Sequence, residues 1–178
     1  YKRQIQHKYA AIHLHPDEIA CKELWTAAFG DDEQFADSFI MRYYSRRRML
    51  TAEAEGRMAA MLHLLPFRTE LGRTTYIYGV ATDPAFRGRG LASQLMREAM
   101  RLIAERGDDA ALLIPTPGKE WLREFYGRFG FAGDVPARFV SADRFDFGTG
   151  DAAADRAMVW RRDSSVPLPE QLTASWHS

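Results

Sequence analysis

Two arginines and two glycines alternate at residues 87–90, in the segment RGRG, directly before a stretch with helical periodicity. A glycine-rich turn that leads into a helix presents unpaired backbone N–H groups and the positive end of the helix dipole, and both attract anions. Arg87 and Arg89 add guanidinium groups, which form charge-assisted hydrogen bonds with phosphate oxygens. The turn therefore predicts a binding site for a pyrophosphate.

The RGRG segment has two less specific interpretations. The segment could be only a tight connection between a strand and a helix. This interpretation stays possible, but it explains neither the arginines nor Gly79, an unfavourable glycine inside the preceding strand. A flexible nucleic-acid-binding arm is disfavoured, because ordered patterns flank the segment and the chain carries no net charge. The Walker A and dinucleotide-binding motifs do not fit, since no Gly-Lys-Ser/Thr follows and Ser93 stands where the latter needs glycine.

Two motifs resemble those of the GCN5-related N-acetyltransferase (GNAT) superfamily. RGRGLA at residues 87–92 matches the family's Arg/Gln-x-x-Gly-x-Gly/Ala signature, and REFYGRFGF at residues 123–131 is similar to the Tyr-x-x-x-Gly-Phe segment near the end of its core. The resemblance extends over about residues 49–131. Residues 76–92 also show a weaker similarity to the acetyltransferase domain of enhanced-intracellular-survival proteins, which favours a small-molecule amine as acceptor.

The resemblance implies that acetyl-CoA is the co-substrate and that no metal is needed. In the family, the pantetheine arm pairs with the backbone of a bulged strand, which would explain Gly79, and the pyrophosphate lies at the following helix start. The tyrosine of the second motif is Tyr126, which would protonate or hydrogen-bond the departing thiolate of CoA. The matching cofactor-binding positions are Val80, Ala81, Thr82, Arg87, Gly88, Arg89, Gly90, Leu91 and Ala92.

The residue that deprotonates the amine is not identified by the sequence. A free amine has a pKa of about 10, so a carboxylate, a histidine or a water chain must take its proton. Glu53, His63 and Glu70 are candidates on predicted strands, but each is more commonly a surface or core residue, and we assign none of them. The asparagine that often precedes the last family helix is replaced by PTPGKEW at residues 115–121, which leaves the acceptor contacts open.

The spacing of apolar residues predicts the elements that position these motifs. Two helices open the chain: Pro16 begins the first and Gly30 ends it, and Asp31 or Asp32 caps the second. Their aromatic residues could line an apolar acceptor pocket, although such residues more commonly pack in a core; they are Trp25, Phe29 and Phe39. The later pattern predicts strands over 49–55, 57–71 and 74–82, a helix over 91–107, a strand over 109–116, a helix over 118–130, and strands over 137–147 and 156–160.

The order strand, helix, strand after residue 74 predicts a right-handed crossover and hence a parallel strand pair. We therefore expect an α/β (α+β) fold of GNAT type, with a mixed, mostly antiparallel central sheet, a splayed parallel pair and helices on both faces. A single acyltransferase domain is expected over 1–162. Residues 163–178 contain prolines and show no clear period, so we expect an irregular tail.

Composition limits the partners. Among the 178 residues, Lys plus Arg and Asp plus Glu are equal at 24 each, so no global field attracts nucleic acid or an anionic membrane. Cys21 is the sole cysteine, which excludes an internal disulfide and agrees with a reducing compartment, and no stretch looks like a membrane span or signal peptide. We expect a cytoplasmic enzyme with a small-molecule amine acceptor and no nucleic-acid or membrane partner. A homodimer is possible.

Two other function classes stay open. The missing base favours a domain that binds acyl-CoA without turning it over, as a sensor or partner domain. An RNA-binding module would use Arg46–Arg48 and the RGRG turn, but it needs a continuous basic face that the sequence does not establish.

Overall fold

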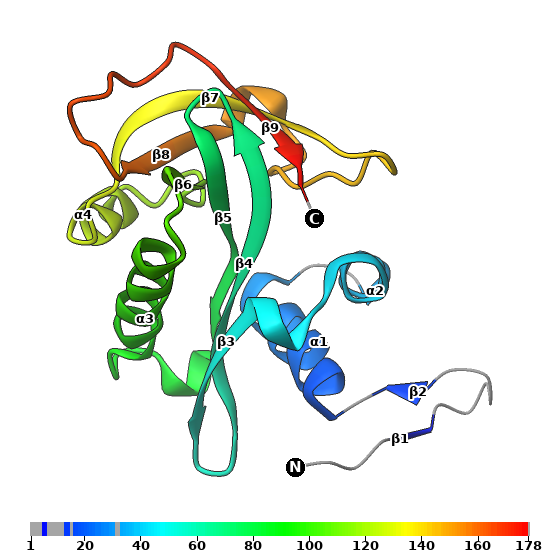
Figure 1. Ribbon diagram of the computed structural model, residues 1–178. Coiled ribbons are helices and arrows are strands. Elements are labelled where there is room, and N and C mark those ends of the chain that lie inside the picture. The colour runs from blue at the N-terminus through cyan, green and yellow to red at the C-terminus, as the bar shows by residue number, and fades with distance from the viewer. Residues whose placement is uncertain (1–4, 7–12, 15, 31–32, 178) are drawn as a thin grey trace. The chain divides into compact units, whose positions relative to one another are not determined.

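The computed structural model describes residues 5–6, 13–14, 16–30 and 33–177 (Figure 1). The chain divides into two compact units, described here one at a time: unit 1 holds Tyr1–His63 and Gly79–Leu95, and unit 2 holds Leu64–Tyr78 and Met96–Ser178. The helices are α1 (Pro16–Phe29), α2 (Glu33–Tyr43), α3 (Leu91–Arg106) and α4 (Trp121–Gly127), with short 3-10 turns η1 (Arg46–Arg48), η2 (Pro84–Phe86) and η3 (Ala152–Ala154). The strands are β1 (Ile5–Gln6), β2 (His13–Leu14), β3 (Met49–Ala54), β4 (Arg57–Thr69), β5 (Gly72–Thr82), β6 (Ala110–Leu113), β7 (Ala132–Val140), β8 (Arg156–Arg161) and β9 (Leu172–Trp176).

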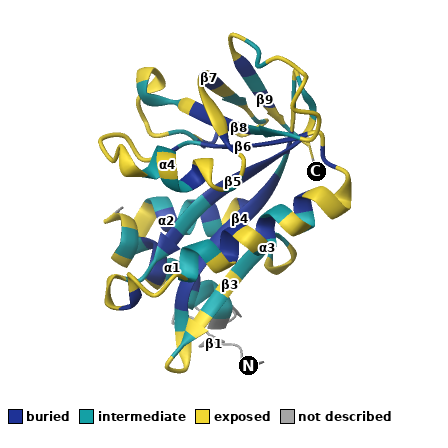
Figure 2. Ribbon diagram, turned by 90° about the vertical axis from the view of Figure 1, so that its left-hand side faces the viewer, coloured by how far each residue is buried: buried dark blue, intermediate teal, exposed yellow. Residues whose placement is uncertain are grey.

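Seven strands form one mixed sheet in the order β3-β4-β5-β6-β8-β7-β9, and β1 pairs with β2 separately. β3 and β4 are antiparallel, whereas β5 and β6 run parallel, with pairing from Thr74–Ala110 to Tyr76–Leu112. All four residues of β6 are buried, as a strand covered on both faces requires, and Figure 2 shows it in dark blue. The predicted mixed α/β class and the parallel strand pair are confirmed.

Unit 1 contains the two predicted helices, which follow the short strands β1 and β2. α1 starts at Pro16 and ends before Gly30, whose φ of +67° is a left-handed conformation that favours glycine. The Trp25 ring on α1 stacks on the Phe39 ring of α2 with a centroid distance of 5.0 Å, and both side chains are buried. Trp25 and Phe39 are therefore core residues, whereas Phe29 is 40% exposed. The expected cap of the second helix, Asp31 or Asp32, lies outside the described residues.

Unit 2 contains a strand that we did not expect. The irregular tail expected over 163–178 is wrong for β9, which pairs parallel with β7 and antiparallel with β4. Leu172 and Ala174 are buried, whereas Thr173 is half-buried and Ser175 is exposed, so β9 has the alternation of a half-buried strand. Because β9 pairs on both sides, the order β4-β5-β6-β8-β7-β9 closes into a ring.

Two elements of unit 2, α4 and β7, also have bounds that differ from the expected ones. α4 covers only Trp121–Gly127, because the residues before it form a turn and the chain leaves the helix before Gly130, whose φ is +91°. β7 covers Ala132–Val140 rather than 137–147, and a register irregularity between Ala132 and Val135 marks its first residues. Bulged strand starts lack the regular alternation that sequence patterns detect.

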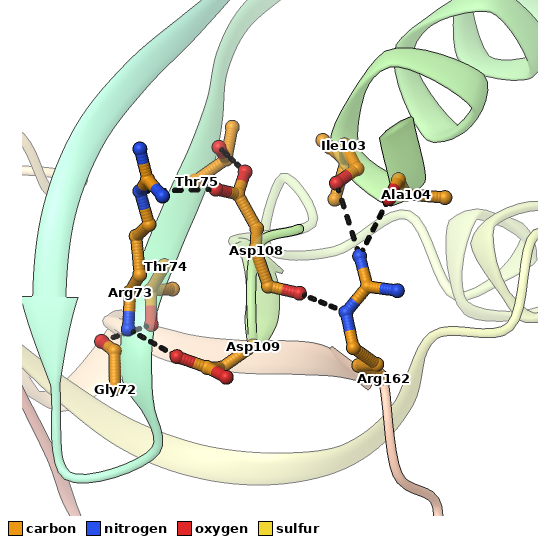
Figure 3. Close-up of polar contacts among 9 residues, drawn as sticks. All are labelled: Gly72, Arg73, Thr74, Thr75, Ile103, Ala104, Asp108, Asp109 and Arg162. Carbon is orange, nitrogen blue, oxygen red and sulfur yellow. Dashed lines mark hydrogen bonds and ion pairs between the residues drawn. The ribbon is translucent and has the colours of Figure 1, made fainter. Parts of the chain in front are cut away.

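A buried polar network in unit 2 ties β6 to its neighbours (Figure 3). The Asp108 carboxylate, 4% exposed, accepts a hydrogen bond of 2.6 Å from the Thr75 hydroxyl and lies 3.6 Å from Nε of Arg73. The Arg162 guanidinium donates to the Asp108 carbonyl at 2.8 Å and to a carbonyl in the last turn of α3 at 2.7 Å. These contacts satisfy the carbonyls at the helix end and position the start of β6 beside β5.

None of the helices in the described part of the chain is both long enough and apolar enough to cross a lipid bilayer.

Candidate active site

The RGRG turn lies in unit 1 and is anchored by the residues directly before it. The Asp83 carboxylate accepts a hydrogen bond of 2.9 Å from the Ala85 N–H, which caps η2, and the Asp83 N–H donates to the Ala59 carbonyl on β4 at 2.8 Å. Residues 87–90 are exposed, and α3 begins at Leu91. The exposed turn therefore leads from a fixed strand end directly into a helix N-terminus, as the sequence predicts.

Gly88 and Gly90 have a conformational reason to be glycine. Their φ values are +80° and +76°, in the left-handed region that L side chains rarely adopt. A Cβ atom at either position would meet nothing within 4 Å, so the surrounding space is open. An anion could approach the backbone amides of this turn without displacing a side chain.

Position 79 requires glycine for a different reason, the packing of neighbouring side chains, which the sequence did not reveal. Its φ is +64°, and an added Cβ would lie 2.8 Å from Cζ3 of Trp25 and 3.1 Å from Cδ2 of His63. Both of those rings are buried, so neither can move aside easily. Gly79 is required by the packing of α1 against β4 and β5 within unit 1. The close approach of a pantetheine arm, the reason implied by the family resemblance, stays a prediction.

The three positions on β5 that we expect to bind the cofactor follow Gly79 directly. Val80 and Thr82 are half-buried, and Ala81 is buried. Val80, Ala81 and Thr82 thus continue into Asp83 and the turn as one uninterrupted stretch of unit 1.

His63 is a fully buried, neutral imidazole. Burial, with the nearby charge of Arg48, lowers its pKa to about 3. Its Nδ1 has no hydrogen-bond partner among the described residues, and its Nε2 lies 3.8 Å from Sγ of Cys21. A group with so low a proton affinity is a poor base for an ammonium of pKa about 10. His63 is therefore unsuited to the role of general base in this conformation.

Glu70 and Glu53, the other two base candidates, differ in their surroundings. Both carboxylate oxygens of Glu70 accept the backbone N–H of Thr173, at 2.9 and 3.1 Å, which anchors the start of β9. Glu53 is exposed on β3. Glu70 thus has a structural task in unit 2, and the base stays unassigned.

Tyr126 lies in unit 2, on α4, and its side chain is buried. Its ring packs edge-on against Phe125 at a centroid distance of 5.1 Å. Burial raises the pKa of the phenol to about 12. Tyr126 therefore stays protonated throughout the physiological range, so its O–H group is available there as a hydrogen-bond donor.

Cys21, Arg46 and Arg48 each have a structural role within unit 1. Burial raises the pKa of the Cys21 thiol to about 12, so it is an inert core residue. Arg46 forms an ion pair of 2.8 Å with Asp17, and the half-buried Arg48 donates to the Tyr43 carbonyl at 2.7 Å. In the described ranges, no group of three histidine, cysteine or acidic side chains is arranged to hold a metal ion.

The buried His63 makes stability depend on pH. Its folded-state pKa of about 3 lies below the ordinary value of 6.5, so the unfolded chain binds a proton first as pH falls. The stabilisation is complete above pH 6.5 and is lost progressively toward pH 3. From pH 7 to pH 5 we expect this residue to lower the free energy of unfolding by about 2 kcal/mol.

Urea titrations of the native chain and of His63→Leu at both pH values measure this effect. The variant should lose about 2 kcal/mol less than the native chain over the same interval. Equal losses would show that His63 titrates normally.

Comparisons with known proteins agree with the motifs. Residues 15–133 match the model of the family described as acetyltransferase (GNAT) domain, and no curated protein matches the chain. The structure resembles YhbS, a GNAT family N-acetyltransferase from Escherichia coli solved with CoA, at a TM-score of 0.63 and 18% identity, over 99% of this chain and 91% of that one. It also resembles a GNAT family acetyltransferase from Brucella melitensis, solved with acetyl-CoA, at a TM-score of 0.58 and 16% identity, over 100% of this chain and 97% of that one.

The weaker similarity to enhanced-intracellular-survival proteins stays a prediction. Eis1 from Mycobacterium abscessus gives a TM-score of 0.49 at 17% identity, over 74% of this chain and 31% of that one. The family model, by contrast, spans well over half of the chain and includes both motifs and the opening helices. The chain therefore belongs to the family of GNAT acetyltransferase domains.

Proposed function

We propose that this chain transfers the acetyl group of acetyl-CoA to a primary amine of a small molecule. The observation that carries the proposal is the exposed RGRG turn, whose two glycines leave open space over backbone amides at the start of α3. Arg87 and Arg89 place positive charge on the same turn. This arrangement suits the pyrophosphate of a coenzyme.

The donor would be bound by one continuous stretch of unit 1. The pantetheine arm would pair with the backbone of Val80, Ala81 and Thr82, and the amides of residues 88–92, with the Arg87 side chain, would hold the pyrophosphate. The GNAT structures from E. coli and B. melitensis were solved with CoA and acetyl-CoA, which supports this donor.

In the reaction, the neutral amine attacks the thioester carbonyl carbon. A C–N bond forms, the C–S bond breaks, and the amine's surplus proton leaves to water or to a base. The backbone N–H near Val80 would polarise the carbonyl oxygen. The phenol of Tyr126 would donate a hydrogen bond to the departing sulfur.

The raised pKa of Tyr126 refines its role. A thiol ordinarily has a pKa of about 8.5. The phenol, with a pKa of about 12, is a weaker acid than the thiol that would form. Complete proton transfer to the sulfur is therefore uphill, and stabilisation of the thiolate by a hydrogen bond is the role that the buried phenol suits best.

The acceptor is proposed as a small-molecule amine on the basis of the weaker family similarity in residues 76–92. A cytoplasmic location and a homodimer stay predictions. A domain that binds acyl-CoA without turnover is the second candidate function, because His63 is a poor base and Glu70 is engaged with Thr173. Turnover of acetyl-CoA in the presence of an acceptor separates the two functions.

Arg87→Ala tests the donor site. The substitution removes a charge-assisted contact, so CoA should bind about tenfold more weakly or worse. Isothermal titration calorimetry of both proteins measures the change. Arg101→Ala is the matched control, since Arg101 is an exposed arginine on α3 that pairs only with acidic neighbours on that helix among the contacts described. Unchanged CoA affinity in folded Arg87→Ala would remove the turn from the donor site.

A further inference from the structure

A second arginine lies beside the RGRG turn within unit 1. Arg57 begins β4, directly after the tight β3–β4 turn formed by Glu55 and Gly56, both with positive φ. Its Cζ lies 4.9 Å from the centroid of the Phe86 ring, and the Cζ of Arg89 lies at the same distance from that ring. We call Arg57 and Arg89 the guanidinium pair. Two cations thus share one buried aromatic platform at the turn.

The position of Arg57 is fixed by neighbouring contacts. The Asp83 N–H donates to the carbonyl of Ala59, two residues after Arg57, and holds the start of β4 beside the strand end that leads into the turn. The Arg57 guanidinium also lies 3.6 Å from Oδ2 of Asp83. Arg57 is thereby held at the turn although it precedes Arg87 by 30 residues and belongs to neither sequence motif.

The carboxylates near the guanidinium pair engage it only weakly. Nη1 of Arg89 lies 3.7 Å from Oε2 of Glu55, and Nη2 of Arg57 lies 3.6 Å from Asp83, both longer than a charge-assisted hydrogen bond of about 2.8 Å. The two arginine side chains are 53% and 58% exposed, so water screens both pairs. Each guanidinium has five N–H donors, most of which such contacts leave available.

We propose that Arg57 and Arg89, stacked on Phe86, together bind a phosphate group of coenzyme A. The inference rests on the proposed use of acetyl-CoA and adds a phosphate-binding residue from β4. The 3′-phosphate, a monoester, carries a charge of about −1.5 to −2 and three terminal oxygens, and the pyrophosphate carries a negative charge on each of its phosphate groups. Either group is more negative than the Glu55 carboxylate and would displace it from Arg89. CoA offers two sources of this group, the pyrophosphate and the 3′-phosphate of the ribose.

The test measures the affinity of CoA and of dephospho-CoA, which lacks the 3′-phosphate, for the native chain, Arg57→Ala and the control Arg101→Ala. Arg57→Ala should bind CoA about tenfold more weakly, and Arg101→Ala should bind it as the native chain does. A loss for CoA alone assigns the pair to the 3′-phosphate, and an equal loss for both ligands assigns it to the pyrophosphate. Unchanged CoA affinity in folded Arg57→Ala overturns the proposal.

Glu55→Gln provides an independent test that keeps the guanidinium pair and its platform intact. Glu55 is an exposed turn residue, and its neutralisation removes the carboxylate that competes for Arg89. CoA should bind about two- to threefold more tightly to this variant at low ionic strength, with the gain shrinking as salt is added. Unchanged or weaker binding contradicts the competition. A native chain that does not bind CoA would instead contradict the proposed function itself.

Discussion

Tyr126→Phe is expected to lower kcat by about 10²- to 10³-fold, the usual effect of removing one hydrogen-bond donor from developing negative charge. The phenylalanine ring keeps the edge-on contact with Phe125 and the burial of this position. The melting temperature and the affinity for CoA should therefore stay close to those of the native chain. Steady-state kinetics and a thermal melt of the same preparation measure the two effects.

Tyr44→Phe is the matched control for this prediction. The Tyr44 hydroxyl is also buried, but it has no hydrogen-bond partner among the described residues, so its removal should leave turnover unchanged. Because burial raises the pKa of Tyr126 to about 12, the native chain and Tyr126→Phe should also share the same pH profile below about pH 10. Full activity of Tyr126→Phe would exclude the phenol from the reaction, and a collapsed melt would show a structural role.

Gly79→Ala is expected to lower the free energy of unfolding by about 2–5 kcal/mol. The left-handed backbone costs an L-residue about 1–2 kcal/mol, and overpacking a filled core costs about 1–3 kcal/mol more. The overpacking arises because the new methyl group would lie 2.8 Å from the buried ring of Trp25. Chemical denaturation of the native chain and the variant measures the difference.

Gly88→Ala separates the two contributions. Gly88 also has a positive φ, but an added Cβ there meets nothing within 4 Å, so only the backbone cost of about 1–2 kcal/mol should appear. A larger loss for Gly79→Ala than for Gly88→Ala supports the contact with Trp25. Equal losses would show that the ring moves aside without cost.

Local sequence signals predicted the elements around the site well. The hairpin pattern of β3 and β4, the uninterrupted apolar run of β6 and the helical period of α3 each lie within one segment, and the structure has all of them close to the expected positions. β9 was missed because its five residues follow a proline-rich stretch that hides the alternation. Its stability comes from pairing with β7 and β4, which are distant in sequence.

The features of the candidate site that could not be predicted depend on distant residues. Gly79 is crowded by Trp25, which lies on another element, so its sequence surroundings showed only that a glycine was unusual there. Arg57 approaches the turn through Phe86 and through the bond from Asp83 to Ala59. The pKa values of Tyr126 and His63 depend on burial, which the sequence does not report.

The central claim is that the chain moves an acetyl group from acetyl-CoA to a small-molecule amine. The most direct measurement incubates the purified chain with acetyl-CoA and a panel of simple amines, amino acids, aminoglycosides and lysine-containing peptides. Thiol release and the mass of each acceptor are followed together. The account predicts that CoA release matches the gain of one acetyl group on a small-molecule amine. Acetyl-CoA that binds but stays intact with every acceptor, or acetylation of peptide lysines alone, would contradict it.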